Sequence, residues 1–275
     1  MNILLFDLEN GSKTLGSKEA ISKKFNLPVL SPSTFQQFQK TVGQLYAVEK
    51  KEVKVKVGSL DVTEERFETV IRDPKLSIDA VVIDTVSELS KKFQRSLLDA
   101  HGVMQLQSWG KLKNKLDAML EFVTRLPGIV ICNCHAKIQT MDSGENKVLP
   151  YIDGSTKEDI SKWFDFVFYT KTVNYPDGTN KYVWQTTHTS MYDHAKDRTQ
   201  LLDAEIEQNY QTVINAAKEK GYDGVKILVI GSPGTGKTYS LNSLNGFVTP
   251  KKTKQTTKKE PVKATTANGT TAVTQ

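Results

Sequence analysis

The chain has 275 residues, of which 38% are hydrophobic and 25% charged, and its formal net charge is +6. This length allows one sizeable α/β domain. Two cysteines, Cys132 and Cys134, are too few for a disulfide framework and lack zinc-site spacing, so we expect buried, reduced thiols. No apolar run approaches the ~18 residues of a membrane span, and residues 1–8 do not fit a signal peptide, so we expect a cytoplasmic protein with no membrane partner.

The net charge is concentrated near one end of the chain. From Thr249 onward there are six lysines and one glutamate, which together supply +5 of the +6. The same segment has almost no large apolar residues, which predicts a disordered tail over 249–275. Such a tail either keeps the protein soluble or tethers it weakly to DNA or RNA. Residues 1–248 are then almost neutral, and we expect them to form a single domain.

Two apolar runs in the first third of the chain end in carboxylates. Residues 3–6 lead into Asp7 and Glu9, and residues 78–83 lead into Asp84. Continuous apolar runs of this length are typical of buried parallel strands. Because ligands of parallel sheets bind at the carboxyl ends of the strands, we expect the three carboxylates at one functional edge.

The segments around these two strands predict mostly helices. We expect helices at 17–25 and from Ser33 to Tyr46, then an exposed edge strand at 50–57 and a helix at 63–72 that Pro74 stops. Two further helices are expected at 86–101 and 108–125 from the spacing of their apolar residues.

The second half of the chain predicts more strands. Residues 129–133 form a third apolar run, followed by His135 and by a polar segment, 136–154, that we expect to be a functional or mobile loop. Strands at 166–173 and 181–187 flank the turn sequence Tyr175-Pro176-Asp177-Gly178, which predicts a β-hairpin. A helix at 201–220 and a strand at 225–230 complete the pattern. Strands that alternate with helices favour an α/β fold with a mainly parallel sheet.

A phosphate-binding motif follows the strand at 225–230. Residues 231–238 read Gly-Ser-Pro-Gly-Thr-Gly-Lys-Thr and match G-x-x-x-x-G-K-[ST] between a strand and a helix-compatible stretch. In such a P-loop, backbone N–H groups surround the phosphates, Lys237 reaches the β/γ-phosphates and the Thr238 hydroxyl binds Mg²⁺. The alternative is a glycine-rich turn that matches by chance. The predicted nucleotide-binding residues are Gly231, Ser232, Pro233, Gly234, Thr235, Gly236, Lys237, Thr238 and Tyr239.

Hydrolysis also requires groups from upstream in the chain. Asp84 closes the run Val81-Val82-Ile83, as a Walker B aspartate does, and would hold Mg²⁺ with Thr238; otherwise it caps the next helix. Glu9 is the candidate that orients water. Asp7 competes with it, but lies deeper on the same face of the strand.

Two other positions are candidates for functional contacts. His135 either senses the γ-phosphate and relays its state to the next segment, or is a hydrogen-bonded histidine at the edge of the core. Lys196 and Arg198 share a face of an extended segment. They either grip one polyanion, for instance across a subunit interface, or form a solvated charge pair.

Taken together, the segments around Glu9, Asp84 and His135 and the pair Lys196 and Arg198 resemble RecA-like ATPases, in particular the small phage forms linked to single-strand DNA recombination and annealing. The resemblance covers most of residues 1–245. It implies ATP and Mg²⁺ as cofactors, Glu9 as the group that activates water, and Asp84 as the Walker B residue.

The same resemblance implies partners. His135 corresponds to the polar residue that couples nucleotide to DNA, although RecA itself has a glutamine there. The loop after it, with Lys137 and Lys147, corresponds to a loop that binds single-stranded DNA; the basic tail is a second candidate. Lys196 and Arg198 would reach a neighbour's site in a homo-oligomer. A phage protein of this kind acts in the cytoplasm of its host.

The order of the motifs departs from the family, whose members begin with the P-loop. Here the P-loop comes last, which predicts a circularly permuted RecA-like core. We expect residues 1–220 to hold the Glu9 and Walker B strands and residues 221–248 to supply the P-loop strand and helix. The former ends would be joined through 221–224, and the new ends would fall between Asn245 and Met1. Alternatively, the P-loop unit inserts into a neighbouring protomer.

Two other functions fit the same motifs. One is a motor ATPase of another class, such as a helicase or packaging ATPase. The other is a protein that binds ATP without hydrolysing it.

Overall fold

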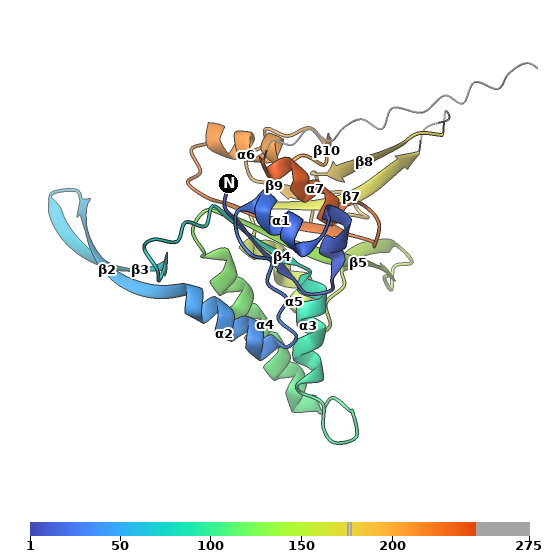
Figure 1. The fold of residues 1–275 in the computed structure, drawn as a ribbon, viewed down its shortest axis with the longest axis horizontal. Coiled ribbons are helices and arrows are strands. Elements are labelled where there is room, and N and C mark those ends of the chain that lie inside the picture. Colours follow the sequence, from blue (N-terminus) through green and yellow to red (C-terminus); the bar gives the residue numbers. More distant parts are fainter. Residues whose placement is uncertain (175, 177, 246–275) are drawn as a thin grey trace, which may run out of the picture.

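The computed structural model describes residues 1–174, 176 and 178–245, and within them the chain folds around one large mixed sheet (Figure 1). The order of its main strands is β1-β4-β5-β11-β7-β8-β10, with β6 paired to β5 and β9 paired to β7. The expected tail, 249–275, lies outside the described residues, as do Tyr175 and Asp177 of the predicted turn.

The centre of this sheet is parallel. It contains β1 (Ile3–Asp7), β4 (Ala80–Asp84), β5 (Ile129–Thr140), β11 (Val225–Gly231) and β7 (Phe166–Asn174). The buried parts of these strands are mostly apolar because helices cover both faces of the sheet. The prediction of an α/β fold with a mainly parallel sheet is confirmed.

Antiparallel strands extend the parallel centre. β8 (Asn180–Gln185) pairs with β7, and β10 (Glu205–Glu207) pairs with β8. The short β9 (Lys196–Asp197) pairs with the beginning of β7, and β6 (Asn146–Pro150) pairs with the second half of β5.

Alternate residues of each central strand enter two separate cores. Leu4 and Phe6 of β1 pack on one face, with α2 (Phe35–Leu45), α3 (Val86–Arg95) and α4 (Leu106–Thr124). Ile3 and Leu5 pack on the other face, with α1 (Lys18–Phe25) and α6 (Tyr210–Glu219).

Short helices complete these two layers. They are 3-10 turns at Gly11–Leu15, Ile160–Trp163 and Leu241–Asn245, with α5 (Thr156–Asp159) and α7 (Lys237–Ser240). Cys132 and Cys134 are free and buried in β5, as expected. Within the described part of the chain, no helix combines the length and apolarity needed to cross a membrane.

The helix expected at 63–72 is wrong, because this segment is part of a strand. β3 (Leu60–Ile71) pairs antiparallel with β2 (Tyr46–Val57) over their whole length. Valine, threonine and phenylalanine favour strands, and Gly58, with φ of 64°, allows the tight turn between the two. Pairing with β2 therefore decides the conformation of this segment.

The loop expected at 136–154 is also wrong in its first part. β5 continues past the sheet to Thr140, and its second half pairs with β6 from Ala136↔Pro150 to Thr140↔Asn146. Gly144, with φ of 83°, sits in the turn. The segment after His135 is therefore a β-hairpin, which we call the 136–150 hairpin.

Two helices are shorter than their apolar spacing suggests. α3 ends at Arg95 rather than near residue 101. α6 begins only at Tyr210, because residues 205–207 pair with β8 and the Asn209 side chain accepts a hydrogen bond from the backbone N–H of Gln211 to cap the helix.

Candidate nucleotide-binding site

The P-loop follows β11, in the middle of the sheet, and Lys237 is folded into it. The Lys237 Nζ donates hydrogen bonds to the carbonyls of Gly231 (2.8 Å) and Ser232 (2.9 Å). Its side chain is 5% exposed, and burial lowers its pKa, although the nearby Asp84, Cys134 and Glu9 act in the opposite direction. A buried ammonium held by carbonyls is a strong partner for an anion that enters the loop.

The P-loop glycines are required by their surroundings. Gly234 and Gly236 have φ of 80° and 91°, in the left-handed region that favours glycine. A Cβ at Gly231 would lie 1.6 Å from Thr170 Oγ1 on β7, so no larger residue fits there without rearrangement. The Thr170 hydroxyl in turn shares a 2.5 Å hydrogen bond with that of Thr235, which fixes the loop to the neighbouring strand.

Asp84 lies at the end of β4 and contacts the P-loop residue Thr238. The Thr238 hydroxyl donates to Asp84 Oδ2 at 2.8 Å, and the amide of Asn133 donates to Asp84 Oδ1 at 3.1 Å. Burial raises the pKa of Asp84, while these two hydrogen bonds act to lower it. Thr85, rather than Asp84, caps α3, since its hydroxyl accepts from the Glu88 N–H.

The oxygens of Asp84 and Thr238 are suited to Mg²⁺. Mg²⁺ binds oxygen ligands and is typically held by one or two protein groups together with substrate phosphates and water. Asp84 and Thr238 offer one oxygen each at hydrogen-bonding distance. Over residues 1–174, 176 and 178–245, no group of three or more His, Cys, Asp or Glu side chains is arranged to hold a metal by itself.

Glu9 lies just beyond β1 and is joined to His135. Glu9 Oε2 is 2.8 Å from His135 Nε2, and the Thr85 hydroxyl donates to the same oxygen at 3.4 Å. Burial raises the pKa of Glu9, but the hydrogen bond and charge of His135, with Lys237 and Thr85, outweigh it and leave the pKa lowered. Glu9 is therefore ionised beside the P-loop lysine.

Asp7 has a different role from Glu9. Its carboxylate accepts hydrogen bonds from the N–H groups of Gly11 (3.0 Å) and Ser12 (3.3 Å) and from the Ser12 hydroxyl. These bonds hold the turn after β1, so Asp7 has little capacity left to orient water. The geometry favours Glu9 over Asp7 as the candidate base.

Lys196 and Arg198 lie away from this site. β9 pairs with the first residues of β7, whereas the P-loop follows the far end of the parallel β11. Lys196 Nζ donates to the Ser161 carbonyl at 2.6 Å, and Arg198 Nη1 pairs with Asp165 Oδ1 at 3.0 Å. Burial, and then the charge of Arg198, lower the pKa of Lys196 to about 8.

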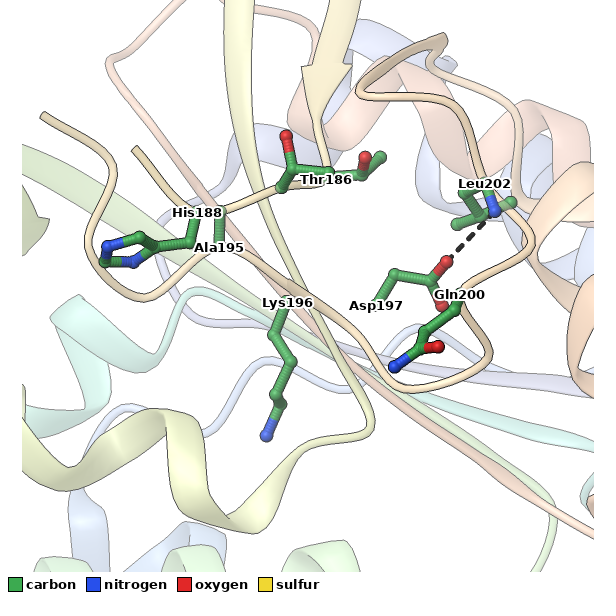
Figure 2. Close-up of a pocket in the computed structure, with 8 residues that line it drawn as sticks. Thr186, His188, Ala195, Lys196, Asp197, Gln200 and Leu202 are labelled. Carbon is green, nitrogen blue, oxygen red and sulfur yellow. Dashed lines mark hydrogen bonds between the residues drawn. The ribbon is translucent and has the colours of Figure 1, made fainter. Parts of the chain in front are cut away.

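A cavity of about 420 Å³ opens beside β9 and does not include the P-loop. Figure 2 shows Lys196 and Asp197 pointing to different sides of the strand, as alternation requires. In the wall of this cavity, Asp197 Oδ2 accepts a hydrogen bond from the Leu202 N–H at 3.0 Å.

A family model described as an AAA domain matches residues 1–199. The chain belongs to the AAA domain family. The match includes Glu9, Asp84 and His135, and the P-loop follows it at 231–238. As a member of this family, the chain is a nucleotide-binding P-loop ATPase domain. No curated protein and no solved structure matched the chain.

The AAA domain also places residues at the site that the sequence did not single out. Asn133 holds Asp84 from the neighbouring strand, and the Gln208 amide donates to the P-loop carbonyl of Thr235 at 2.9 Å. Gly11 lies between the carboxylates: a Cβ there would be 3.6 Å from both Asp84 Oδ2 and Glu9 Oε1. Asn133 could have been predicted from the sequence. If the apolar runs at 78–83 and 129–133 are aligned as parallel strands, Asn133 lies next to Asp84. The predicted site residue Tyr239 has an exposed ring on α7.

Proposed function

We propose that this AAA domain is a RecA-like protein that hydrolyses ATP with Mg²⁺ and acts on single-stranded DNA. The observation that carries the proposal is the 2.8 Å hydrogen bond from Thr238 to Asp84, with the bonded pair Glu9 and His135 at the same edge of the sheet. In the non-catalytic alternative, the P-loop does not contact the upstream carboxylates. The hydrogen bond between Thr238 and Asp84 argues against that alternative.

The residues of the site divide the work of hydrolysis. Lys237 and the P-loop N–H groups bind the phosphates, and Thr238 and Asp84 hold the metal. Bound Mg²⁺ neutralises charge on the phosphate oxygens. Glu9 orients the attacking water and accepts its proton, which requires the ionised form that its lowered pKa favours.

Single-stranded DNA is proposed as the partner because of the surface beside His135. The 136–150 hairpin begins at the next residue, and the His135 carbonyl accepts the Tyr151 N–H at 2.7 Å. Lys91 and Lys137 lie 4.7 Å and 5.6 Å from the centre of the partly exposed Tyr151 ring. An exposed aromatic ring beside two cations suits a stacked base and its phosphates.

Circular permutation explains how a P-loop near the end of the sequence joins site residues from the first half of the sequence. β11 lies between β5 and β7 in the same chain, which supports a P-loop that completes its own site rather than a neighbour's. Both ends of the described chain contact the same short segment, residues 24–26, which supports the same proposal. The Asn245 amide donates to the Lys24 carbonyl at 2.9 Å, and Asn26 donates to the Met1 carbonyl at 3.4 Å.

We also infer a homo-oligomer in which Lys196 and Arg198 serve a neighbour's nucleotide. Their distance from the P-loop of their own chain leaves them no role there, whereas a cation supplied across an interface stabilises phosphate charge. Arg198 is half exposed and therefore accessible to a second subunit.

The test is ATP hydrolysis by the purified protein with and without single-stranded DNA. We expect DNA to stimulate turnover, and Lys237→Ala and Asp84→Asn to abolish it, with Lys111→Ala on α4 as an exposed control. Unchanged turnover in Lys237→Ala would refute the assignment of the site. Unwinding of a duplex, without annealing of single strands, would favour the helicase alternative, and tight ATP binding without turnover would favour a binding protein.

A further inference from the structure

β2 and β3 form an arm, residues 46–71, that stands clear of the rest of the molecule (Figure 1). Within the described residues these two 12-residue strands pair only with each other. The arm is anchored at its base, where Tyr46 is buried and Arg72 Nε donates to the carbonyls of Gly43 (2.8 Å) and Tyr46 (2.9 Å).

An arm of this kind is poorly stabilised by itself. A two-stranded hairpin without a packed face is marginally stable in water, and three or more strands are usually needed. Both long edges of the arm present rows of N–H and C=O groups that can pair with another strand. The arm therefore offers two open edges for strand addition.

One face of the outer half of the arm carries a stripe of apolar side chains. Cross-strand partners share a face, and the register pairs Val55 with Val62 and Val57 with Leu60. Val57, Leu60 and Val62 are 61%, 68% and 44% exposed. Contiguous exposed apolar side chains on a soluble protein mark an interaction surface.

The charges of the arm indicate which surface it fits. β2 carries four lysines and two glutamates, a net +2, whereas β3 carries one arginine and four acids, a net −3. Within the arm, Lys50 pairs with Glu65 and Lys51 with Glu68, so part of this charge is already matched between the two strands. Lys54 and Lys56 of β2 and Asp61 of β3 lie nearer the tip of the arm. The net charge of the two strands together is −1, which does not favour binding to a polyanion. The basic β2 of one copy does, however, complement the acidic β3 of a second copy.

We propose that the arm is an assembly element that pairs with the arm of a second copy of this chain, basic β2 beside the acidic β3 of its neighbour. When two arms point the same way, this pairing is antiparallel, and it extends the sheet to four strands with the apolar stripes on one side. Because different edges meet, the contact is head-to-tail and builds a ring or a filament. This inference does not rest on ATP hydrolysis or on DNA binding.

Charge-reversal variants of the full chain test the proposal by sedimentation velocity. Lys54→Glu with Lys56→Glu makes both strands acidic, and Asp61→Lys with Glu64→Lys makes both strands basic. We expect the wild type to assemble, and each double variant to assemble about tenfold or more weakly, because like charges then face each other across the contact. A one-to-one mixture of the two variants should assemble again, since an acidic strand then always meets a basic one.

The control is Lys23→Glu with Lys111→Glu, an equal charge change at exposed positions on α1 and α4, which should assemble as the wild type does. Circular dichroism and thermal unfolding check that each variant is folded, and ATP binding should be retained in all of them. A monomeric wild type, assembly that survives both reversals, or a mixture that fails to assemble would each overturn the proposal. Loss of ATP binding in the wild type would contradict the proposed function and leave the result on the arm unaffected.

Discussion

Glu9 and His135 are 126 positions apart in the sequence, and their side chains are joined by a 2.8 Å hydrogen bond between Oε2 and Nε2. The bond links the candidate base of the reaction to the strand that continues into the 136–150 hairpin. A change in the conformation of the hairpin can therefore reach the Glu9 carboxylate through this one hydrogen bond.

Replacing His135 should change the pH dependence of ATP hydrolysis. Burial raises the pKa of Glu9 and His135 acts to lower it, so in His135→Ala the pKa rises. A base must be ionised to accept a proton, and the acidic limb of the kcat/KM profile should therefore move to higher pH. His188→Ala, at an exposed histidine outside the site, is the control. An unshifted limb would mean that Glu9 does not act as the base.

Glu9 and Asp7 should respond differently to removal of their charge. Glu9→Gln should lower the turnover of ATP by about 100-fold or more while ATP still binds, because general-base catalysis is lost. Asp7→Asn should mainly lower the free energy of unfolding, since Asp7 holds the turn at Gly11 and Ser12. Turnover, nucleotide binding and urea unfolding measured on both variants distinguish them, and the opposite result would exchange their roles.

A methyl group at Gly11 should impair the site without unfolding the domain. The Cβ would make ordinary contacts of 3.6 Å with Asp84 Oδ2 and Glu9 Oε1, and so would fill the space between the two carboxylates. We expect Gly11→Ala to need more Mg²⁺ for half-maximal hydrolysis and to turn over more slowly, with a nearly unchanged unfolding midpoint. In Gly110→Ala the added Cβ meets nothing within 4 Å, and its Mg²⁺ dependence should equal that of the wild type.

If Lys196 and Arg198 act on a neighbour's nucleotide, defective chains should complement each other. Lys237→Ala lacks a working P-loop but keeps both cations, and a Lys196→Ala, Arg198→Ala variant has the reverse defect. Their mixture should hydrolyse ATP faster than the sum of the two separate samples, because some interfaces then combine intact parts. Activity equal to that sum would place the two cations outside catalysis.

The free energy of unfolding should rise between pH 8 and 10, in part through Lys226. Burial lowers the pKa of this lysine to about 8, and its Nζ donates to the carbonyls of Leu126 and Gly128. Above pH 8 the unfolded state binds more protons than the folded state, so stability increases with pH up to the unfolded pKa. Denaturant unfolding at several pH values gives the free energy of unfolding as a function of pH. The slope of this free energy against pH should be smaller for Lys226→Met than for the wild type. Equal slopes would show that the folded-state pKa is not depressed.

The sequence predicted β1, β4 and the first half of β5 well because each is an apolar run that leads into polar residues. The same runs located the carboxyl edge, where Asp84, Glu9 and Thr238 now lie in one region. Residues 63–72 were misassigned because their helix-forming acids compete with β-branched neighbours, and only the partner strand decides between them. Likewise, the hairpin after His135 depends on pairing between residues that a single strand does not reveal.

The position of β11 has a consequence for how the molecule forms. β11 lies between β5 and β7, so the middle of the sheet is filled by a strand made long after both of its neighbours. β5 and β7 leave the ribosome before β11, so the position between them stays unfilled until β11 has been made. Pairings between segments that are distant in the sequence also form slowly. A chain that stops before residue 225 would thus lack the centre of its own core, and it is a poor candidate for an independently folding fragment.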